Sequence, residues 1–266
     1  MLTILSNVAK RYPLITFIVL AYALSWWLAP LGGGNLPFGP LFAVLIVVPL
    51  IDGKAGLKRW WAFITRWRGK LSWYVTAIIL IFALNFAAAA LAVLLGASFP
   101  SAETIAAWPG VLFVTFPIYF ILITIGEETG WRGFVMPRLQ EKHSALTASL
   151  ILAVIVSLWH LPLVLFNEDP FNALPLMLIT FGAQFILTWL ANQVEGKVLI
   201  VMLAHAAQGG LGGEYFGSMF TGPDAVLERW LLTAIFWVVA MGIVLLTGST
   251  LNRRQPTEAA AMTARS

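Results

Sequence analysis

The most constraining feature of this chain is a series of long apolar runs that contain almost no charged residues. Two of them are VLFVTFPIYFILITI (residues 111–125) and SALTASLILAVIVSLWHLP (residues 144–162). A helix that crosses a bilayer needs about 20 predominantly apolar residues. Of the 266 residues, 60% are hydrophobic and 11% are charged, whereas roughly a quarter are charged in soluble domains. We therefore expect an integral membrane protein whose first partner is the lipid bilayer.

The apolar runs predict an all-α, polytopic membrane helix bundle of about eight transmembrane helices. The chain reads as a single transmembrane domain over residues 1–252, followed by a polar tail, residues 253–266, that we expect to be disordered. It contains no cysteine, which excludes disulfides, thiolate metal sites and cysteine nucleophiles. The expected spans lie near residues 14–31, 38–51, 73–95, 112–139, 146–166, 171–192, 198–212 and 230–248.

Lysine and arginine in the loops predict the orientation of the bundle, because cytoplasmic loops are enriched in both. With eight spans, nearly all basic residues fall on one side: Lys10, Arg11, Lys54, Lys58, Arg59, Arg66, Arg68, Lys70, Arg138, Lys142, Lys197, Arg253, Arg254 and Arg265. The other side holds Glu103, Glu168, Asp169, Glu214, Asp224 and Glu228, with Arg229 as its one basic residue. Both termini are therefore expected in the cytoplasm, and the location that we expect is a bacterial cytoplasmic membrane.

The segment GKAGLKRWWAFITRWRGKLSW (residues 53–73) alternates basic residues with tryptophans. This pattern is typical of an amphipathic segment at the lipid headgroups. Because two spans enclose the segment, we expect no nucleic-acid partner.

The stretch GEETGWRG (residues 126–133) places charged residues inside an apolar span. Such residues are costly in a membrane and indicate a functional site. Glu128 and Arg132 are four residues apart, a favourable spacing for an ion pair on a helix, and the pair could equally be structural. Glu127 points about 100° away from Glu128 and has Trp131, not a cation, four residues on. An unpaired glutamate there suits a general base or acid.

Two of the three histidines, His160 and His205, lie inside apolar runs, whereas His143 lies in the turn QEKHSA. Each intramembrane histidine could simply bond to a neighbouring carbonyl. However, Glu127 and His160 are equally distant from the turn around residue 143, so an antiparallel hairpin would bring them to the same depth. His205 could approach from a third helix. These three side chains could either bind zinc or activate a water.

Other catalytic arrangements fit the sequence poorly. There is no HExxH motif, the candidate nucleophiles Ser157 and Ser218 have no supporting motif, and the expected spans contain no aspartate. These features disfavour a HExxH metalloprotease, a serine protease and an aspartyl dyad.

The motif EETGWR fits the EExxxR pattern of the CPBP (or ABI) family of intramembrane proteases, which includes the type II CAAX prenyl endopeptidases. The segments GEETGWRGFVMPRLQ, SLWHLP and GKVLIVMLAHAA resemble the bacterial branch in order and spacing, as does AGLKRWWAFITRWRGKLSWY upstream. Together they cover about residues 40–210.

The resemblance implies an α-helical endopeptidase that cleaves a peptide or membrane-associated protein near the cytoplasmic face. It implies that Glu127 is catalytic and activates water with His160, and that His205 polarises the scissile carbonyl or completes a metal site. Glu128 and Arg132 would support the pocket. The resemblance leaves the cofactor open: one Zn²⁺ held by Glu127, His160 and His205, or none.

Two positions depart from the family pattern. The second motif, FxxxH, has Val156 in place of phenylalanine, and the third has Gly209 where an asparagine is common. Gln208 could supply the missing donor only if the helix is irregular there. Loss of such a donor can slow a reaction roughly 100- to 1000-fold.

Two other functions compete with proteolysis. One is a non-catalytic membrane scaffold or bacteriocin-immunity protein of the same fold. The other is a transporter in which Glu127 and the histidines relay protons. The clustering of the polar residues near one face, without a polar path across the bilayer, argues against transport.

Overall fold

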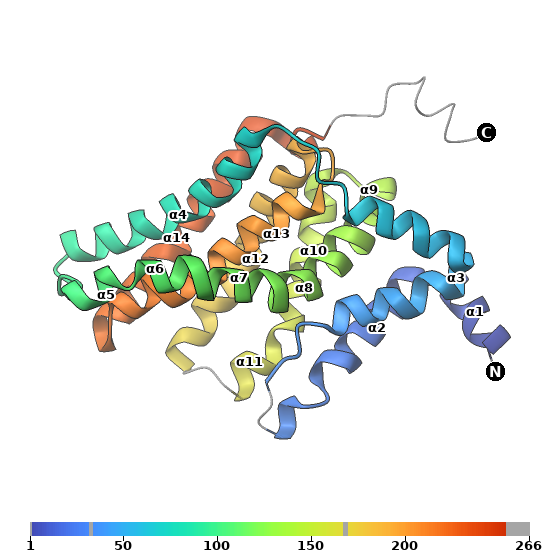
Figure 1. Ribbon diagram of the computed structural model, residues 1–266, viewed down its shortest axis with the longest axis horizontal. Coiled ribbons are helices and arrows are strands. Elements are labelled where there is room, and N and C mark those ends of the chain that lie inside the picture. Colours follow the sequence, from blue (N-terminus) through green and yellow to red (C-terminus); the bar gives the residue numbers. More distant parts are fainter. Residues whose placement is uncertain (1, 32–33, 167–169, 254–266) are drawn as a thin grey trace.

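The computed structural model of the chain describes residues 2–31, 34–166 and 170–253, and within them the backbone forms helices and loops without strands. Figure 1 shows the helices packed into one bundle. The N-terminal part consists of α1 (Leu2–Arg11), α2 (Pro13–Trp26), α3 (Gly39–Ile64) and α4 (Leu71–Leu94). The C-terminal part consists of α10 (Ala145–Trp159), α11 (Leu161–Phe166), α12 (Pro170–Gln193), α13 (Val198–Ala206) and α14 (Gly222–Thr247).

Between these parts runs an almost continuous helical rod, Ala102–Lys142. Its α-helical pieces are α5 (Ala102–Ala106), α6 (Trp108–Gly110), α7 (Phe116–Ile118), α8 (Ile125–Gly130) and α9 (Met136–Lys142). Wider π-helical turns separate them at Val111–Thr115, Tyr119–Thr124 and Trp131–Val135, and another π-helical segment, Ala207–Phe216, follows α13. Short 3₁₀ turns lie at Ala29–Leu31, Gly217–Met219 and Gly248–Thr250.

The prediction of a polytopic helical bundle is confirmed. Seven helical segments of the described chain are long and apolar enough to cross a membrane: Pro13–Leu31, Gly39–Ile64, Leu71–Leu94, Ala102–Lys142, Ala145–Phe166, Ala173–Gln193 and Gly222–Thr250. The seventh of the eight expected spans, residues 198–212, corresponds to α13 and the start of the π-helical segment after it, which are not among the seven. This π-helical segment begins AQGGLGGEY (residues 207–215) and is rich in glycine and polar residues. The expected tail lies outside the described residues from 254 on, as do Glu168 and Asp169.

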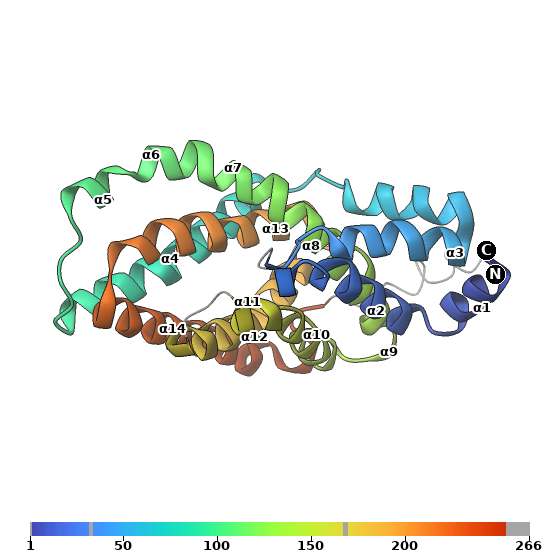
Figure 2. The ribbon, with the colours of Figure 1, turned by 90° about the horizontal axis from the view of Figure 1, so that it is seen from below.

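Helix α3 is not one straight span. Gly53 adopts φ 62° and ψ −157°, a conformation that favours glycine, and divides α3 into two helical pieces. Figure 2 shows the two pieces side by side, folded back on one another. In the second piece Trp60 is buried while Trp61 is 60% exposed, so the tryptophan-rich segment is amphipathic.

The helix ends gather at two opposite edges of the bundle (Figure 1). At one edge, Arg66 donates a hydrogen bond to the carbonyl oxygen of Glu195 at 3.0 Å, and Arg253 donates to the carbonyl oxygen of Gln140. We call this the basic edge, since loops 64–71, 142–145 and 193–198 meet there. At the opposite edge, the backbone N–H of Ser98 donates to Asp224 at 2.9 Å.

Small residues let α8 approach α3 closely. A Cβ atom on Gly126 would lie 2.5 Å from the carbonyl oxygen of Pro37, and one on Gly130 would lie 2.5 Å from Cβ of Pro40. Glycines four residues apart on one helix face permit close helix packing in membranes. This contact sets the orientation of α8 and leaves Glu127 and Glu128 between the two glycines.

We expect Gly126→Ala to destabilise the protein by about 1–3 kcal/mol, because the added methyl group meets backbone atoms that cannot rotate away. Gly242→Ala is the matched control, since a Cβ atom at Gly242 meets no heavy atom within 4 Å. Thermal unfolding in detergent measures both variants. Equal unfolding temperatures for the two variants would contradict the close approach of α8 to residues 37–40.

Candidate active site

The charged residues of α8 form a buried network with α12. Arg132 Nη1 lies 3.1 Å from Glu128 Oε2, and the two side chains are 2% and 1% exposed. Arg132 Nη2 donates a hydrogen bond of 2.6 Å to Oε1 of Gln184 on α12. The amide nitrogen of Gln184 donates in turn to the Thr180 carbonyl oxygen at 3.3 Å. The guanidinium thus has a charged partner and a neutral one, as a buried cation requires.

His205 joins this network from α13. Its Nδ1 lies 2.8 Å from Glu128 Oε1 and its Nε2 lies 4.0 Å from Glu127 Oε2. Because a carboxylate only accepts hydrogen bonds, the proton shared with ionised Glu128 is on Nδ1. In the neutral ring, Nε2 then carries a lone pair on the side of Glu127. The sequence analysis placed Glu128 and Arg132 together; the contact between Glu128 and His205 was not predicted.

Glu127 differs from Glu128 in its partners. It is 4% exposed, and its Oε2 has no hydrogen-bond partner among the described residues. A buried carboxylate oxygen without a partner is uncommon and calls for an explanation. Its neighbour His205 is too distant for a direct hydrogen bond but close enough for a water to lie against both.

His160 ends α10 and lines the same cavity as Glu127. Its Nδ1 donates a 2.8 Å hydrogen bond to the Val156 carbonyl oxygen, and its ring stands at 87° to that of Trp159. The sequence analysis expected Glu127 and His160 at equal depth. They share the cavity, but no hydrogen bond joins them in the described part of the chain.

The proposed metal ligands do not assemble into a metal site. Among residues 2–31, 34–166 and 170–253, no group of three histidine, cysteine, aspartate or glutamate side chains is close enough to hold an ion. His160 and His205 each use Nδ1 for a hydrogen bond within the protein. The side chains as placed therefore do not fit Zn²⁺ bound by Glu127, His160 and His205.

A cavity of about 480 Å³ connects these groups. Its walls come from the loop before α3, the rod, and helices α10 to α14. Its polar lining residues include Asn35, Tyr119, Glu127, Glu128, His160, Thr180, Gln184, His205, Gln208, Glu214, Glu228 and Arg229. The cavity is large enough for several side chains of a peptide, and it brings together residues from α4, the rod and every helix from α10 to α14.

The helix after His205 is irregular. This is the condition under which Gln208 could supply the donor that the family asparagine would provide at position 209. Residues Ala207–Phe216 are π-helical, and Gln208 lines the cavity. Its Oε1 accepts a 3.0 Å hydrogen bond from Asn85, whose side-chain nitrogen also donates to the Ile81 carbonyl oxygen at 2.8 Å. With Oε1 engaged in this way, the amide N–H groups of Gln208 remain as donors.

Gly209 accommodates an aromatic ring. A Cβ atom at this position would lie 2.1 Å from Cδ1 of Tyr119, and the Tyr119 hydroxyl donates a 2.7 Å hydrogen bond to Glu214. The ring of Tyr119 therefore occupies the space that a side chain at position 209 would need.

We expect Gly209→Ala to lower stability by about 1–3 kcal/mol through overpacking against this ring. In a chain that also carries Tyr119→Ala, the same glycine substitution should cost much less, because residues in contact are energetically coupled. Thermal unfolding of the two single variants and the double variant gives the coupling. Additive effects would show that the ring does not occupy this space.

Four residues of the site were not predicted: Asn85, Tyr119, Gln184 and Glu228. Asn85 and Gln184 are polar residues inside expected spans. The reasoning that singled out Glu127, that a polar side chain inside a membrane span indicates a functional site, could also have identified them. Glu228 is 3% exposed with a carboxylate oxygen that lacks a partner in the described chain. It had been assigned to a loop, because the apolar run after it begins at residue 230. Tyr119 gave no signal in the sequence.

Comparison with known proteins finds two sequence similarities over the segment that carries these residues. A family profile described as type II CAAX prenyl endopeptidase Rce1-like matches residues 108–210. CAAX prenyl protease 2 of Methanococcus maripaludis is 28% identical over 100 residues, which are 34% of this chain and 37% of that protein. The match thus spans about a third of the length of this curated relative. The segment that the profile matches contains Glu127, His160 and His205, and over this segment the chain is similar to type II CAAX prenyl endopeptidases.

Proposed function

We propose that this protein is an intramembrane endopeptidase of the CAAX-protease type in which Glu127 activates the attacking water. One observation carries the proposal: a buried carboxylate oxygen of Glu127 has no hydrogen-bond partner among the residues that the structure describes, and it lies 4.0 Å from Nε2 of His205. A water placed between these atoms has an acceptor for each of its protons. The family match and the named CAAX protease relative support peptide-bond hydrolysis as the reaction.

In this mechanism the water gives one proton to Glu127 while its oxygen attacks the carbonyl carbon of the scissile peptide bond. Its second hydrogen is held by the Nε2 lone pair of His205. As the tetrahedral intermediate collapses, the C–N bond breaks and Glu127 returns the proton to the leaving amine. Glu127 is thus the base in the first step and the acid in the second.

The other polar groups position the reactants. Gln184 holds Arg132, Arg132 holds Glu128, and Glu128 holds the His205 ring through Nδ1, so Nε2 stays directed toward Glu127. The second histidine, His160, has its Nδ1 fixed by Val156 and offers Nε2 to the cavity. The N–H groups of Gln208 are the donors available to the oxyanion, which needs such donors in a site that excludes bulk water.

The substrate class that we propose is a peptide or the membrane-associated part of a protein. Processing of a signalling or antimicrobial peptide in a bacterial cytoplasmic membrane fits this size of site. Since the side chains as placed do not fit a zinc site, no step of the proposed reaction is routed through a metal ion, and Glu127 transfers the proton from the water to the leaving amine.

The direct test is incubation of the purified protein in detergent with a peptide library, followed by identification of products by mass spectrometry. Defined cleavage products would support the proposal. A folded protein that cleaves no peptide would overturn it in favour of a non-catalytic scaffold or bacteriocin-immunity protein. Zinc measured at one per chain in the active preparation would contradict the metal-free arrangement of Glu127.

A further inference from the structure

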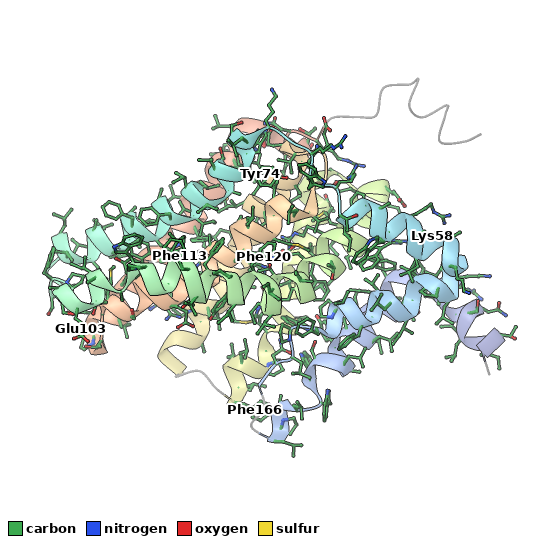
Figure 3. All side chains as sticks on the ribbon, viewed as in Figure 1. Lys58, Tyr74, Glu103, Phe113, Phe120 and Phe166 are labelled. Atoms are coloured by element: carbon green, nitrogen blue, oxygen red, sulfur yellow. The ribbon has the colours of Figure 1, made fainter. Side chains whose placement is uncertain are left out.

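The two edges of the bundle differ in charge. Helix α1 lies against the first piece of α3 through a 2.8 Å hydrogen bond from Ser6 to the Leu50 carbonyl oxygen, which brings its C-terminal basic residues to the basic edge. Figure 3 shows Lys58 and Tyr74 toward this edge, with Glu103 and Phe166 on the other side of the bundle. The described basic residues that the loop pattern assigns to this side are Lys10, Arg11, Lys54, Lys58, Arg59, Arg66, Arg68, Lys70, Arg138, Lys142, Lys197 and Arg253.

The lining of the cavity comes from the middle of the bundle and from the opposite edge. Beyond the catalytic groups, it includes Asn35 and Pro37 before α3, Leu163 in α11, Gly213 and Gly217 after α13, and Glu228 and Arg229 near the start of α14. Among the described residues, no lining residue belongs to segments 53–70, 138–145, 194–198 or 248–253. The cavity therefore lies on the side of the bundle away from the basic edge, where Gly213 and Glu214 in its lining are exposed.

Tight packing closes the cavity on the side of the basic edge. Phe134 and Val135 follow Glu127 along the rod and are 0% exposed. Ile200 and Val201 on α13 and Leu190 on α12 are also fully buried. A peptide approaching from the basic edge would have to pass through this packed core, whereas one approaching from the opposite edge meets the opening directly.

Basic loops are retained in the cytoplasm during membrane insertion. The geometry points to an opening on the extracytoplasmic face, and we propose that the cavity takes the extracytoplasmic part of a membrane-inserted or translocated polypeptide. The nature of this substrate rests on the proposed peptidase function, but the position of the opening does not. The proposal departs from cleavage near the cytoplasmic face, which the family resemblance implied.

The absence of native cysteine makes this directly testable with single-cysteine variants of the full chain. Gly213→Cys and, as a second variant, Gly217→Cys report on the opening, because Cβ atoms at both positions meet only ordinary contacts. Glu103→Cys reports on the same edge outside the cavity, and Lys58→Cys reports on the basic edge; both residues are exposed. Intact bacterial cells that express each variant are treated with a membrane-impermeant maleimide, before and after permeabilisation.

We expect the variants at residues 213, 217 and 103 to be labelled in intact cells, and the Lys58→Cys variant only after permeabilisation. Labelling of Lys58→Cys alone in intact cells would overturn the proposal by reversing the orientation. Labelling at residue 103 but at neither 213 nor 217 would overturn it by showing that the cavity is closed at this face. Because labelling requires no catalysis, these results are independent of whether the protein cleaves peptides.

Discussion

Glu127→Gln is expected to lower the rate of peptide cleavage by about 100- to 10,000-fold, the range that a general acid–base group contributes. Glutamine has nearly the same shape as glutamate but cannot take a proton from water. Because Glu127 Oε2 makes no hydrogen bond in the described protein, the substitution at this oxygen breaks none. The thermal unfolding temperature in detergent should therefore stay close to that of the wild type while activity is lost.

The matched control is Glu103→Gln, which removes one negative charge from an exposed position in α5. It should retain full activity. His205→Gln is informative beside it, because it removes the group that we expect to hold the water while it leaves Glu127 in place. A Glu127→Gln protein that cleaves peptides at the wild-type rate would remove Glu127 from the mechanism and leave the cavity without a general base.

Arg132→Met is expected to lower the free energy of unfolding by about 3–5 kcal/mol, the usual cost of leaving one member of a buried ion pair without its partner. The substitution removes the cation from Glu128 and the donor from Oε1 of Gln184. Both groups are buried, so bulk water solvates them poorly once these partners are lost. Unfolding of the purified protein in detergent, followed by far-UV circular dichroism, measures the change.

Lys197→Met tests the same charge change at a partly exposed pair, in which the Lys197 side chain is 17% exposed. Lys197 lies 3.3 Å from Glu195, whose side chain is 65% exposed, and such surface pairs contribute about 0–1 kcal/mol. The double variant Glu128→Gln/Arg132→Met should be more stable than the sum of the two single changes predicts, because the second change removes a charge that the first left unpaired. Equal effects of Arg132→Met and Lys197→Met would show that the Arg132 pair is solvated.

The sequence revealed much of the candidate site because charge inside a membrane span is costly. That cost singled out Glu127, Glu128 and Arg132, and the histidines inside apolar runs followed by the same reasoning. Contacts between helices were harder to foresee: the bond between Glu128 and His205 depends on the relative rotation of α8 and α13, which no single-helix pattern encodes.

The fold was predicted at the level of helices but not of their irregularities. Hydropathy identified the apolar spans, yet it gave no sign that α3 folds back at Gly53 or that π-helical turns interrupt the rod. Gly209 shows the limit most clearly. Considered alone it is a missing donor, whereas in the structure it makes room for Tyr119, a residue 90 positions away that hydrophobic periodicity treats as one more apolar side chain.

The π-helical segment Ala207–Phe216 makes the shape of the cavity depend on the number of residues as well as on their identity. Each residue added to or removed from a helix rotates everything beyond it, by about 100° in an α-helix. Deleting one glycine from this segment would turn Glu214 away from Tyr119 and move Gly217 off the cavity wall, without altering any side chain. Insertions and deletions here are thus a route to a differently shaped site on an unchanged set of catalytic residues.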